Sequence, residues 1–178
     1  MVQVRQSGAV ICPAREVTMT ERSERALESW QQRVGTLEGV SEWHTIDQAQ
    51  INAFAEATLD RQFIHVDPER AAQRSPYKVP IAHGFLTLSL LPYLVASALE
   101  ASAPPPAGLI AGINYGLDRV RFPAPVRVDS RVRARSELLT VERVAGNTLQ
   151  LKRKVTIEIE GEDKPGCVAE ALSRLVYG

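Results

Sequence analysis

Hydrophobic and polar positions follow one period in the first part of the chain and another in the second. Before Pro104-Pro105-Pro106, apolar residues recur every three or four positions, which is typical of helices that bury one face. Beyond the prolines, apolar and polar residues alternate, which is typical of strands that bury one face. The pattern therefore predicts helices first and a sheet afterwards.

The alternating pattern beyond the prolines predicts four strands, whose apolar faces must be buried against another element. The strands are expected at Leu109–Arg121, 131–138, 149–159 and Val168–Val176. Gly146-Asn147 fits the turn between the second and the third. The apolar helix expected from about His83 to residue 100 is too short to cross a membrane and is interrupted by Ser89 and Pro92, so we expect it to be buried. The predicted fold class is α+β, an antiparallel sheet curled around this one helix.

The N-terminal part carries a different signature. Residues 1 to about 20 show no clear period, whereas Glu21–Val34 is charged, has a helical period and is followed by Gly35, a plausible helix stop. We therefore expect an N-terminal extension at residues 1–38, partly disordered with one helix, and a single domain at residues 39–178.

The charge balance argues against a highly charged partner. Lys and Arg together number 21, as do Asp and Glu, so the chain has no net charge to attract nucleic acid or an anionic membrane. The two cysteines, Cys12 and Cys167, form no disulfide framework, and no signal peptide is evident, so we expect a cytoplasmic protein. Arginines do cluster in the strands, where they form either a solvated outer face or a local attraction for a phosphate-bearing carrier such as coenzyme A. They are Arg119, Arg121, Arg127, Arg131, Arg133 and Arg135.

Asp60 and His65 lie in a stretch without regular period, between two helix-cap signals. Thr45-Ile46-Asp47-Gln48 resembles a capping box that starts the helix before them, and Asp67 followed by proline starts the next. A carboxylate and an imidazole on one rigidly held loop can share a water, one accepting its proton while the other donates. The alternative is a solvated local pair; a zinc site is poorly supported because no further histidine or cysteine lies close by in sequence.

A glycine at the start of the apolar helix offers a second chemical group. The N–H of Gly84 lacks a partner within the helix and can stabilise an oxyanion, and a glycine allows close approach. An ordinary N-terminal glycine is the alternative. His83 before it is expected to cap or pack, and His44 to be structural. No Gly-x-Ser-x-Gly context supports serine-hydrolase chemistry.

Two motifs together resemble the hydratase motif of the MaoC-like dehydratases, which include the (R)-specific enoyl-CoA hydratases. The first is Asp60-x-x-x-x-His65-x-Asp67-Pro68 and the second runs from Ile81 to Ser89. The resemblance extends from about Ser41 to the C-terminus and is closest to a subgroup that includes hydratases supplying polyhydroxyalkanoate monomers and proteins like nodulation protein N. It implies a hot-dog fold, a homodimer with the active site near the subunit interface, and no metal or redox cofactor, with coenzyme A as part of the substrate.

The resemblance also assigns roles. It implies that Asp60 and His65 hold the catalytic water and that the Gly84 N–H binds the thioester oxygen. The further residues it implies as substrate contacts are Gln62, His83, Phe85 and Asn114. Gln62 stands where many members have Asn, and Pro92 stands near a serine that some short-chain hydratases have.

The expected function is reversible hydration of a trans-2-enoyl-CoA to an (R)-3-hydroxyacyl-CoA. Asp60 would take a proton from the attacking water, and His65 would orient that water and return a proton to the α-carbon. Two alternatives stay open: an acyl-CoA thioesterase on the same fold, and a subunit that binds acyl thioesters without catalysis.

Overall fold

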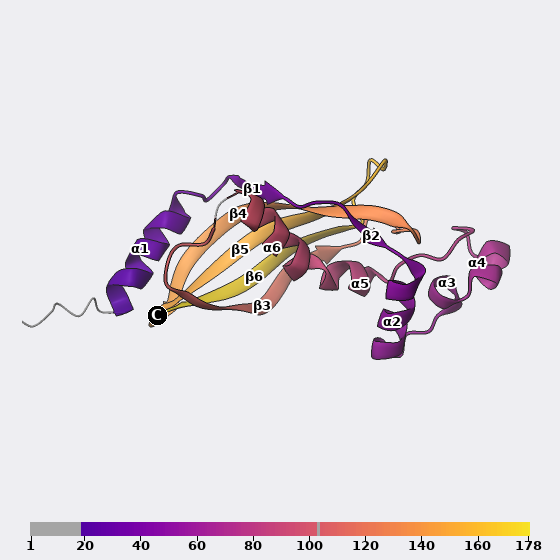
Figure 1. Ribbon diagram of the computed structural model, residues 1–178, viewed down its shortest axis with the longest axis horizontal. Coiled ribbons are helices and arrows are strands. Elements are labelled where there is room, and N and C mark those ends of the chain that lie inside the picture. Colours follow the sequence, from indigo (N-terminus) through magenta and orange to yellow (C-terminus); the bar gives the residue numbers. More distant parts are fainter. Residues whose placement is uncertain (1–18, 103) are drawn as a thin grey trace, which may run out of the picture.

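A single six-stranded antiparallel sheet curves around the helices in the computed structural model, which describes residues 19–102 and 104–178 (Figure 1). The strands are β1 (Leu37–Val40), β2 (His44–Ile46), β3 (Leu109–Arg121), β4 (Ser130–Ala145), β5 (Thr148–Ile159) and β6 (Cys167–Tyr177). The helices are α1 (Met19–Gln31), α2 (Gln48–Thr58), α3 (Phe63–Val66), α4 (Pro68–Arg74), α5 (Gly84–Ser89) and α6 (Leu91–Ser102). The sheet order is β1-β4-β5-β6-β3, with β2 also paired to β4. This is the expected α+β hot-dog arrangement.

The expected strands are present, and the apolar positions of β4 and β5 point to the helices, whereas most of β3 is exposed. Along β5 every second residue, from Leu149 to Ile159, is buried, because successive side chains of a strand point to opposite faces. The predicted turn is also present, with Gly146 in the left-handed region at φ 50°. No helix of the described residues is long and apolar enough to cross a membrane.

The buried helix is broken, which differs from the single helix expected from about His83 to residue 100. Its first part, α5, ends at Ser89, and α6 begins at Leu91. Pro92 explains the break, because its ring has no N–H to donate and clashes with the carbonyl four residues earlier. The break separates the residues around Gly84 from the longer helix that fills the core.

Two apolar clusters lie against the sheet, not one. The larger cluster contains Leu94 of α6 together with Val132, Ile157 and other sheet residues. The smaller cluster contains Trp30 of α1, which also donates from Nε1 to the Tyr177 hydroxyl at 2.7 Å. The expectation that one helix covers the whole sheet is therefore wrong, because α1 covers the end near the C-terminus (Figure 1). The helix within the extension is confirmed, although it ends three residues before Val34; the part of the extension expected to be disordered lies outside the described residues.

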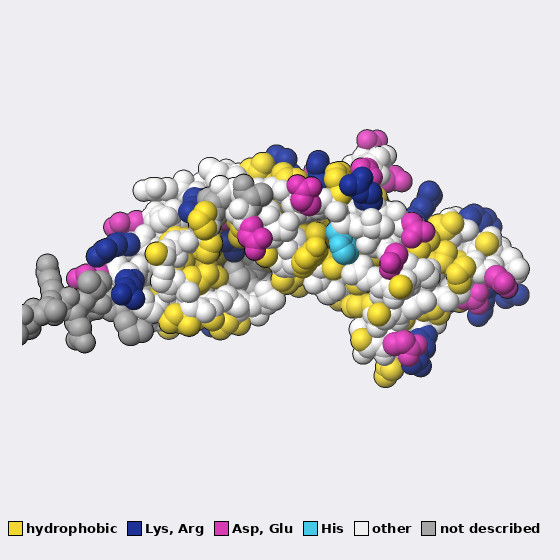
Figure 2. Space-filling view, in the orientation of Figure 1, with side chains coloured by type: hydrophobic (Ala, Val, Ile, Leu, Met, Phe, Trp, Pro, Cys, Tyr) yellow, Lys and Arg dark blue, Asp and Glu magenta, His cyan; other side chains and the backbone are white. Residues whose placement is uncertain are grey.

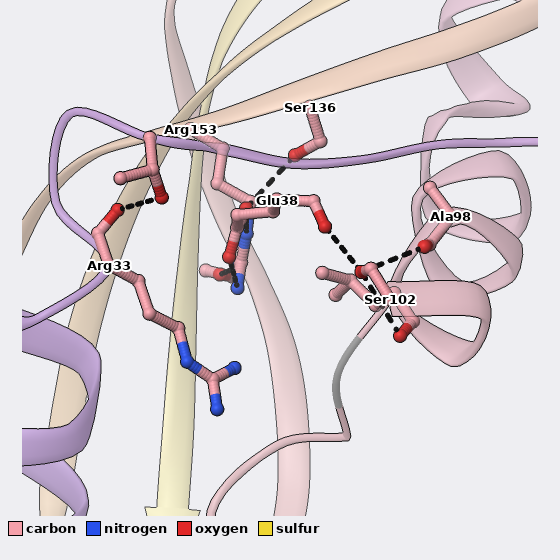
Figure 3. Close-up of polar contacts among 9 residues, drawn as sticks. Arg33, Glu38, Ala98, Ser102, Ser136 and Arg153 are labelled. Carbon is pink, nitrogen blue, oxygen red and sulfur yellow. Dashed lines mark hydrogen bonds and ion pairs between the residues drawn. The ribbon is translucent and has the colours of Figure 1, made fainter.

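A buried ion pair, Glu38–Arg153, lies beside the smaller apolar cluster (Figure 3). The Arg153 guanidinium carbon lies 5.3 Å from the centroid of the Trp30 ring. The Glu38 carboxylate accepts from Nε and Nη2 of Arg153 at 2.7 and 3.2 Å, and from the Ser136 hydroxyl at 3.0 Å. The Ser102 hydroxyl at the end of α6 donates to the Glu38 carbonyl. Because these bonds join β1 to β4, β5 and α6, Glu38 is part of the folded sheet although it lies at the edge of the expected extension.

Candidate functional site

Helix α2 leads the chain to Asp60. Its N-cap is Asp47, whose side chain accepts from the Gln50 N–H at 2.8 Å, so the capping box expected from Thr45 to Gln48 is wrong by two residues. A left-handed residue, Leu59 at φ 64°, ends the helix. The chain then turns away from the helix axis, and the Asp60 side chain is exposed to solvent.

His65 lies in a short helix, α3, where the sequence pattern indicated only an irregular stretch. Four residues are too few for a helical period to be recognised in a sequence. The His65 Nδ1 lies 2.6 Å from the Ile81 carbonyl, and Gln48 Nε2 donates to the His65 carbonyl at 2.8 Å. Asp67 then caps α4 by accepting from the Arg70 N–H at 2.9 Å, as expected.

These bonds fix which nitrogen of His65 can act on a substrate. A carbonyl oxygen only accepts hydrogen bonds, so Nδ1 of His65 carries the hydrogen and Nε2 is left as the acceptor. Burial lowers the pKa of His65, with the nearby His83 acting in the same direction, while the Ile81 bond and Asp60 oppose the shift. His65 therefore presents an unprotonated Nε2 at neutral pH, ready to accept a hydrogen bond from water.

Asp60, His65 and His83 form one cluster. A carboxylate oxygen of Asp60 and one ring nitrogen of each histidine all lie within 4.8 Å of one another. The two imidazole rings stack with centroids 3.8 Å apart and planes 26° from parallel. The donor types would suit a divalent cation. However, nearly parallel stacked rings direct their in-plane lone pairs side by side and not toward one point, so both rings cannot ligate one ion in this arrangement.

Gly84 begins α5, next to this cluster. Among the described residues its N–H has no hydrogen-bond acceptor, as expected for the first residue of a helix. A Cβ built on Gly84 would lie 3.0 Å from the ring of Phe122, so a side chain here would displace that ring. Phe122 also contacts Phe85 in an edge-on pair, with centroids 6.0 Å apart. Gly84 therefore offers a free N–H beside the two aromatic rings.

The remaining expected contacts fall in different places. Gln62 is the exposed N-cap residue of α3 and makes no side-chain capping bond. Phe85 is 68% exposed on α5, whereas His83 is only 3% exposed. Asn114 lies in the middle of β3, opposite Ser173 of β6, and no hydrogen bond among the described residues joins its side chain to the cluster. The structure thus groups His83 with Asp60 and His65 and leaves Asn114 on the edge strand.

The strand arginines differ in their partners. Arg119, Arg131 and Arg133 each pair with a glutamate, at 3.3, 2.9 and 2.7 Å. Within the described part of the chain Arg121, next to Phe122, has no carboxylate within ion-pair distance and is exposed. Acidic and basic side chains are interspersed on the face seen in Figure 2. Three of the six arginines of the cluster are therefore neutralised on the outer face, whereas Arg121, Arg127 and Arg135 have no carboxylate partner among the described residues.

Sequence reasoning missed three contributors to the site. Gln48 and the Ile81 carbonyl hold His65 from 17 and 16 residues away. Phe122 lies against Gly84 from the far end of β3. No local period or motif signals such tertiary contacts.

Comparison with known proteins identifies the family to which this site belongs. Residues 29–160 match the family described as MaoC like domain. The chain is 51% identical over 138 residues to 3-hydroxyacyl-thioester dehydratase Z of Mycobacterium tuberculosis, covering 78% of this chain and 87% of the relative. It is 48% identical over 146 residues to nodulation protein N of Rhizobium leguminosarum bv. viciae, covering 82% of this chain and 88% of the relative.

A solved structure supports the same assignment. The (R)-hydratase from A. caviae involved in PHA biosynthesis superposes with a TM-score of 0.62 at 26% identity, covering 79% of this chain and 94% of that one. The family match, residues 29–160, includes β1 to β5, the buried helix and the cluster of Asp60, His65 and His83, and ends before β6. The chain therefore belongs to the MaoC-like dehydratase family, a family of hydro-lyases with the hot-dog fold.

Proposed function

We propose that this protein is an (R)-specific enoyl-CoA hydratase, which adds water reversibly to a trans-2-enoyl-CoA and forms an (R)-3-hydroxyacyl-CoA. The observation that carries the proposal is the Asp60–His65 pair, a carboxylate within 4.8 Å of an imidazole nitrogen. One water between the two groups can give a hydrogen to each, which is the arrangement needed to activate it.

The geometry supports a division of labour between the two side chains. The unprotonated Nε2 of His65 accepts a hydrogen bond from the water and orients it, while Asp60 accepts the other hydrogen. The water oxygen then bonds to the β-carbon as its proton passes to the pair. Because His65 carries no second proton, the proton returned to the α-carbon is the one taken from the water. Both additions come from one face of the substrate, so the addition is syn.

The thioester oxygen is assigned to the Gly84 N–H. As the β-carbon is attacked, negative charge develops on that oxygen, and a fixed donor aimed at it lowers the barrier. Gly84 supplies an N–H without an acceptor among the described residues, beside the exposed rings of Phe85 and Phe122. A thioester substrate also agrees with the name of the relative from M. tuberculosis, a 3-hydroxyacyl-thioester dehydratase.

We further propose that two copies pair along β3. This strand ends the sheet, and most of its residues are exposed. Its exposed apolar side chains are Ile110, Ile113, Tyr115 and Leu117. A long apolar edge strand is prone to pair with another chain unless it is covered. In such a dimer Asn114 lies at the subunit interface.

Sedimentation of the wild type should give a dimer, and Ile113→Lys should give a monomer; a monomeric wild type would contradict the pairing.

The reaction is tested with purified protein and crotonyl-CoA. The proposal expects loss of the enoyl absorbance, formation of the (R)-3-hydroxy product and no release of free thiol. Dehydration of the (R)-3-hydroxyacyl-CoA should restore the absorbance. Thiol release detected by a disulfide reagent would indicate a thioesterase instead, and saturable binding without turnover of any enoyl-CoA would indicate a non-catalytic binding subunit.

A further inference from the structure

His83 is a buried titratable side chain to which the proposed mechanism gives no role. Its ring is packed between His65, at a centroid distance of 3.8 Å, and Phe54, at 5.1 Å. It is 3% exposed. A histidine so enclosed contacts substrate poorly, but it lies against both of the residues assigned to the catalytic water.

One nitrogen of His83 holds the main chain at Asp60. Nε2 lies 2.9 Å from the Asp60 carbonyl. Because a carbonyl only accepts, Nε2 carries the hydrogen and Nδ1 is left with its lone pair. Nδ1 is buried and has no hydrogen-bond partner among the described residues. The ring of His83 therefore makes one hydrogen bond, from Nε2. Its buried Nδ1 stays without a partner among the described residues, and an unpaired buried polar atom is uncommon in proteins.

Asp60 depends on this bond more than His65 does. The His65 side chain is fixed by the Ile81 carbonyl, and its main chain by Gln48. Asp60, by contrast, lies in an irregular segment after the left-handed Leu59, and its side chain is exposed. Within the part of the chain that the structure describes, the bond from His83 is the one hydrogen bond to Asp60.

We infer that His83 is a positioning residue that tethers Asp60 through the Nε2–H···O=C bond and so holds its carboxylate opposite the His65 ring. This inference rests on the proposed function, because it assumes that Asp60 acts on the water held with His65. A displacement of about 1 Å in such a group can lower a rate by about 10²-fold. Loss of the tether should therefore lower kcat and leave KM nearly unchanged.

Three substitutions separate the tether from simple packing. His83→Gln places an amide N–H near the position of Nε2 and keeps the donor without the ring. His83→Phe keeps a ring for stacking without the donor, and His83→Ala removes both. We expect kcat for crotonyl-CoA to fall about 10²-fold in the Phe and Ala variants and less than about tenfold in the Gln variant, with KM within about threefold in all three. A Phe variant with wild-type kcat, or a Gln variant as slow as the Ala variant, would overturn the inference.

A measurement on the unmodified protein keeps the inference testable if these variants do not fold. Long-range ¹H–¹⁵N correlation spectra report which imidazole nitrogen carries the hydrogen. We expect the hydrogen on Nε2 of His83 and on Nδ1 of His65. A hydrogen on Nδ1 of His83, with Nε2 unprotonated, would overturn the tether. If the wild type does not hydrate any enoyl-CoA, the proposed function fails, whereas the tautomers still report on the tether alone.

Discussion

Replacement of Glu38 by Gln is expected to destabilise the protein far more than the same replacement at Glu158. Both glutamates pair with an arginine at 2.7 Å, Glu38 with Arg153 and Glu158 with Arg133. The Glu38–Arg153 side chains are only 2% and 8% exposed, whereas those of Glu158–Arg133 are 32% and 36% exposed. The two pairs therefore have the same shortest distance and differ in burial, and Glu38 accepts a second bond from its arginine whereas Glu158 accepts one.

The magnitudes follow from that difference. Removal of one partner of a buried pair leaves the other charge uncompensated and costs about 3–5 kcal/mol. The amide introduced by Glu38→Gln can still accept a hydrogen bond from Arg153, so we expect the lower end, about 3 kcal/mol, which corresponds to a fall in Tm of roughly 6–12 °C for a chain of this size. An exposed pair contributes about 0–1 kcal/mol, so Glu158→Gln should lower Tm by at most about 4 °C.

The assay is thermal unfolding followed by circular dichroism at fixed protein concentration. A third variant, Glu38→Met with Arg153→Met, removes both charges and should recover much of the lost stability, because apolar pairs often replace buried ion pairs without loss. Equal Tm values for Glu38→Gln and Glu158→Gln would refute the reasoning. They would mean that the Glu38 segment and α1 do not form one cooperative unit with the sheet.

Four further predictions concern the site. Gly84→Ala brings a Cβ to 3.0 Å from the Phe122 ring and should lower kcat/KM by about tenfold, about 1.4 kcal/mol, with recovery on adding Phe122→Leu; no recovery would mean that the ring is not the cause. Because the pKa of His65 is lowered in the folded state, kcat/KM should hold its plateau as pH falls to about 6.5 and decline only below it, and an acid limb centred above pH 7 would contradict this. The lowered pKa also means that, as pH falls, His65 is protonated in the unfolded chain before it is protonated in the folded protein. The free energy of unfolding should therefore decrease as pH falls below about 6.5, and His65→Gln should remove this contribution. Arg121→Glu should raise KM for crotonyl-CoA by about tenfold but leave KM for crotonyl-pantetheine, which has no phosphate, unchanged. The control variant is Arg135→Glu, because Arg135 is on β4 and also has no carboxylate partner among the described residues.

Sequence periodicity was sufficient to predict the strands whose apolar and polar residues alternate over many positions. The bounds of β3 were predicted from Leu109 to Arg121, and Pro68 after Asp67 marked the start of α4 correctly. Ser89 and Pro92 were recognised as interruptions of the apolar stretch, but a break of the helix between Ser89 and Leu91 was not predicted. The docking of α1 could not be predicted either, since Trp30 meets Tyr177 147 residues further along the chain.

The site divides in the same way. Asp60, His65 and Gly84 were assigned through family motifs that can be recognised in the sequence. The contact of His83 with the Asp60 carbonyl joins residues 23 positions apart, and the contact of Phe122 with Gly84 joins a strand end to a helix start. Such contacts depend on how the sheet wraps the helices, and no local pattern encodes them.

The central claim, that Asp60 and His65 together activate the water, is tested most directly by the turnover of Asp60→Asn and His65→Ala. Each variant is first shown to be folded by its circular dichroism spectrum and Tm, and crotonyl-CoA hydration is then measured at saturating substrate. Each acid–base group typically contributes about 10²–10⁴-fold to a rate, so kcat should fall by at least about 10²-fold in both variants. Turnover near the wild-type rate in either folded variant would contradict the account.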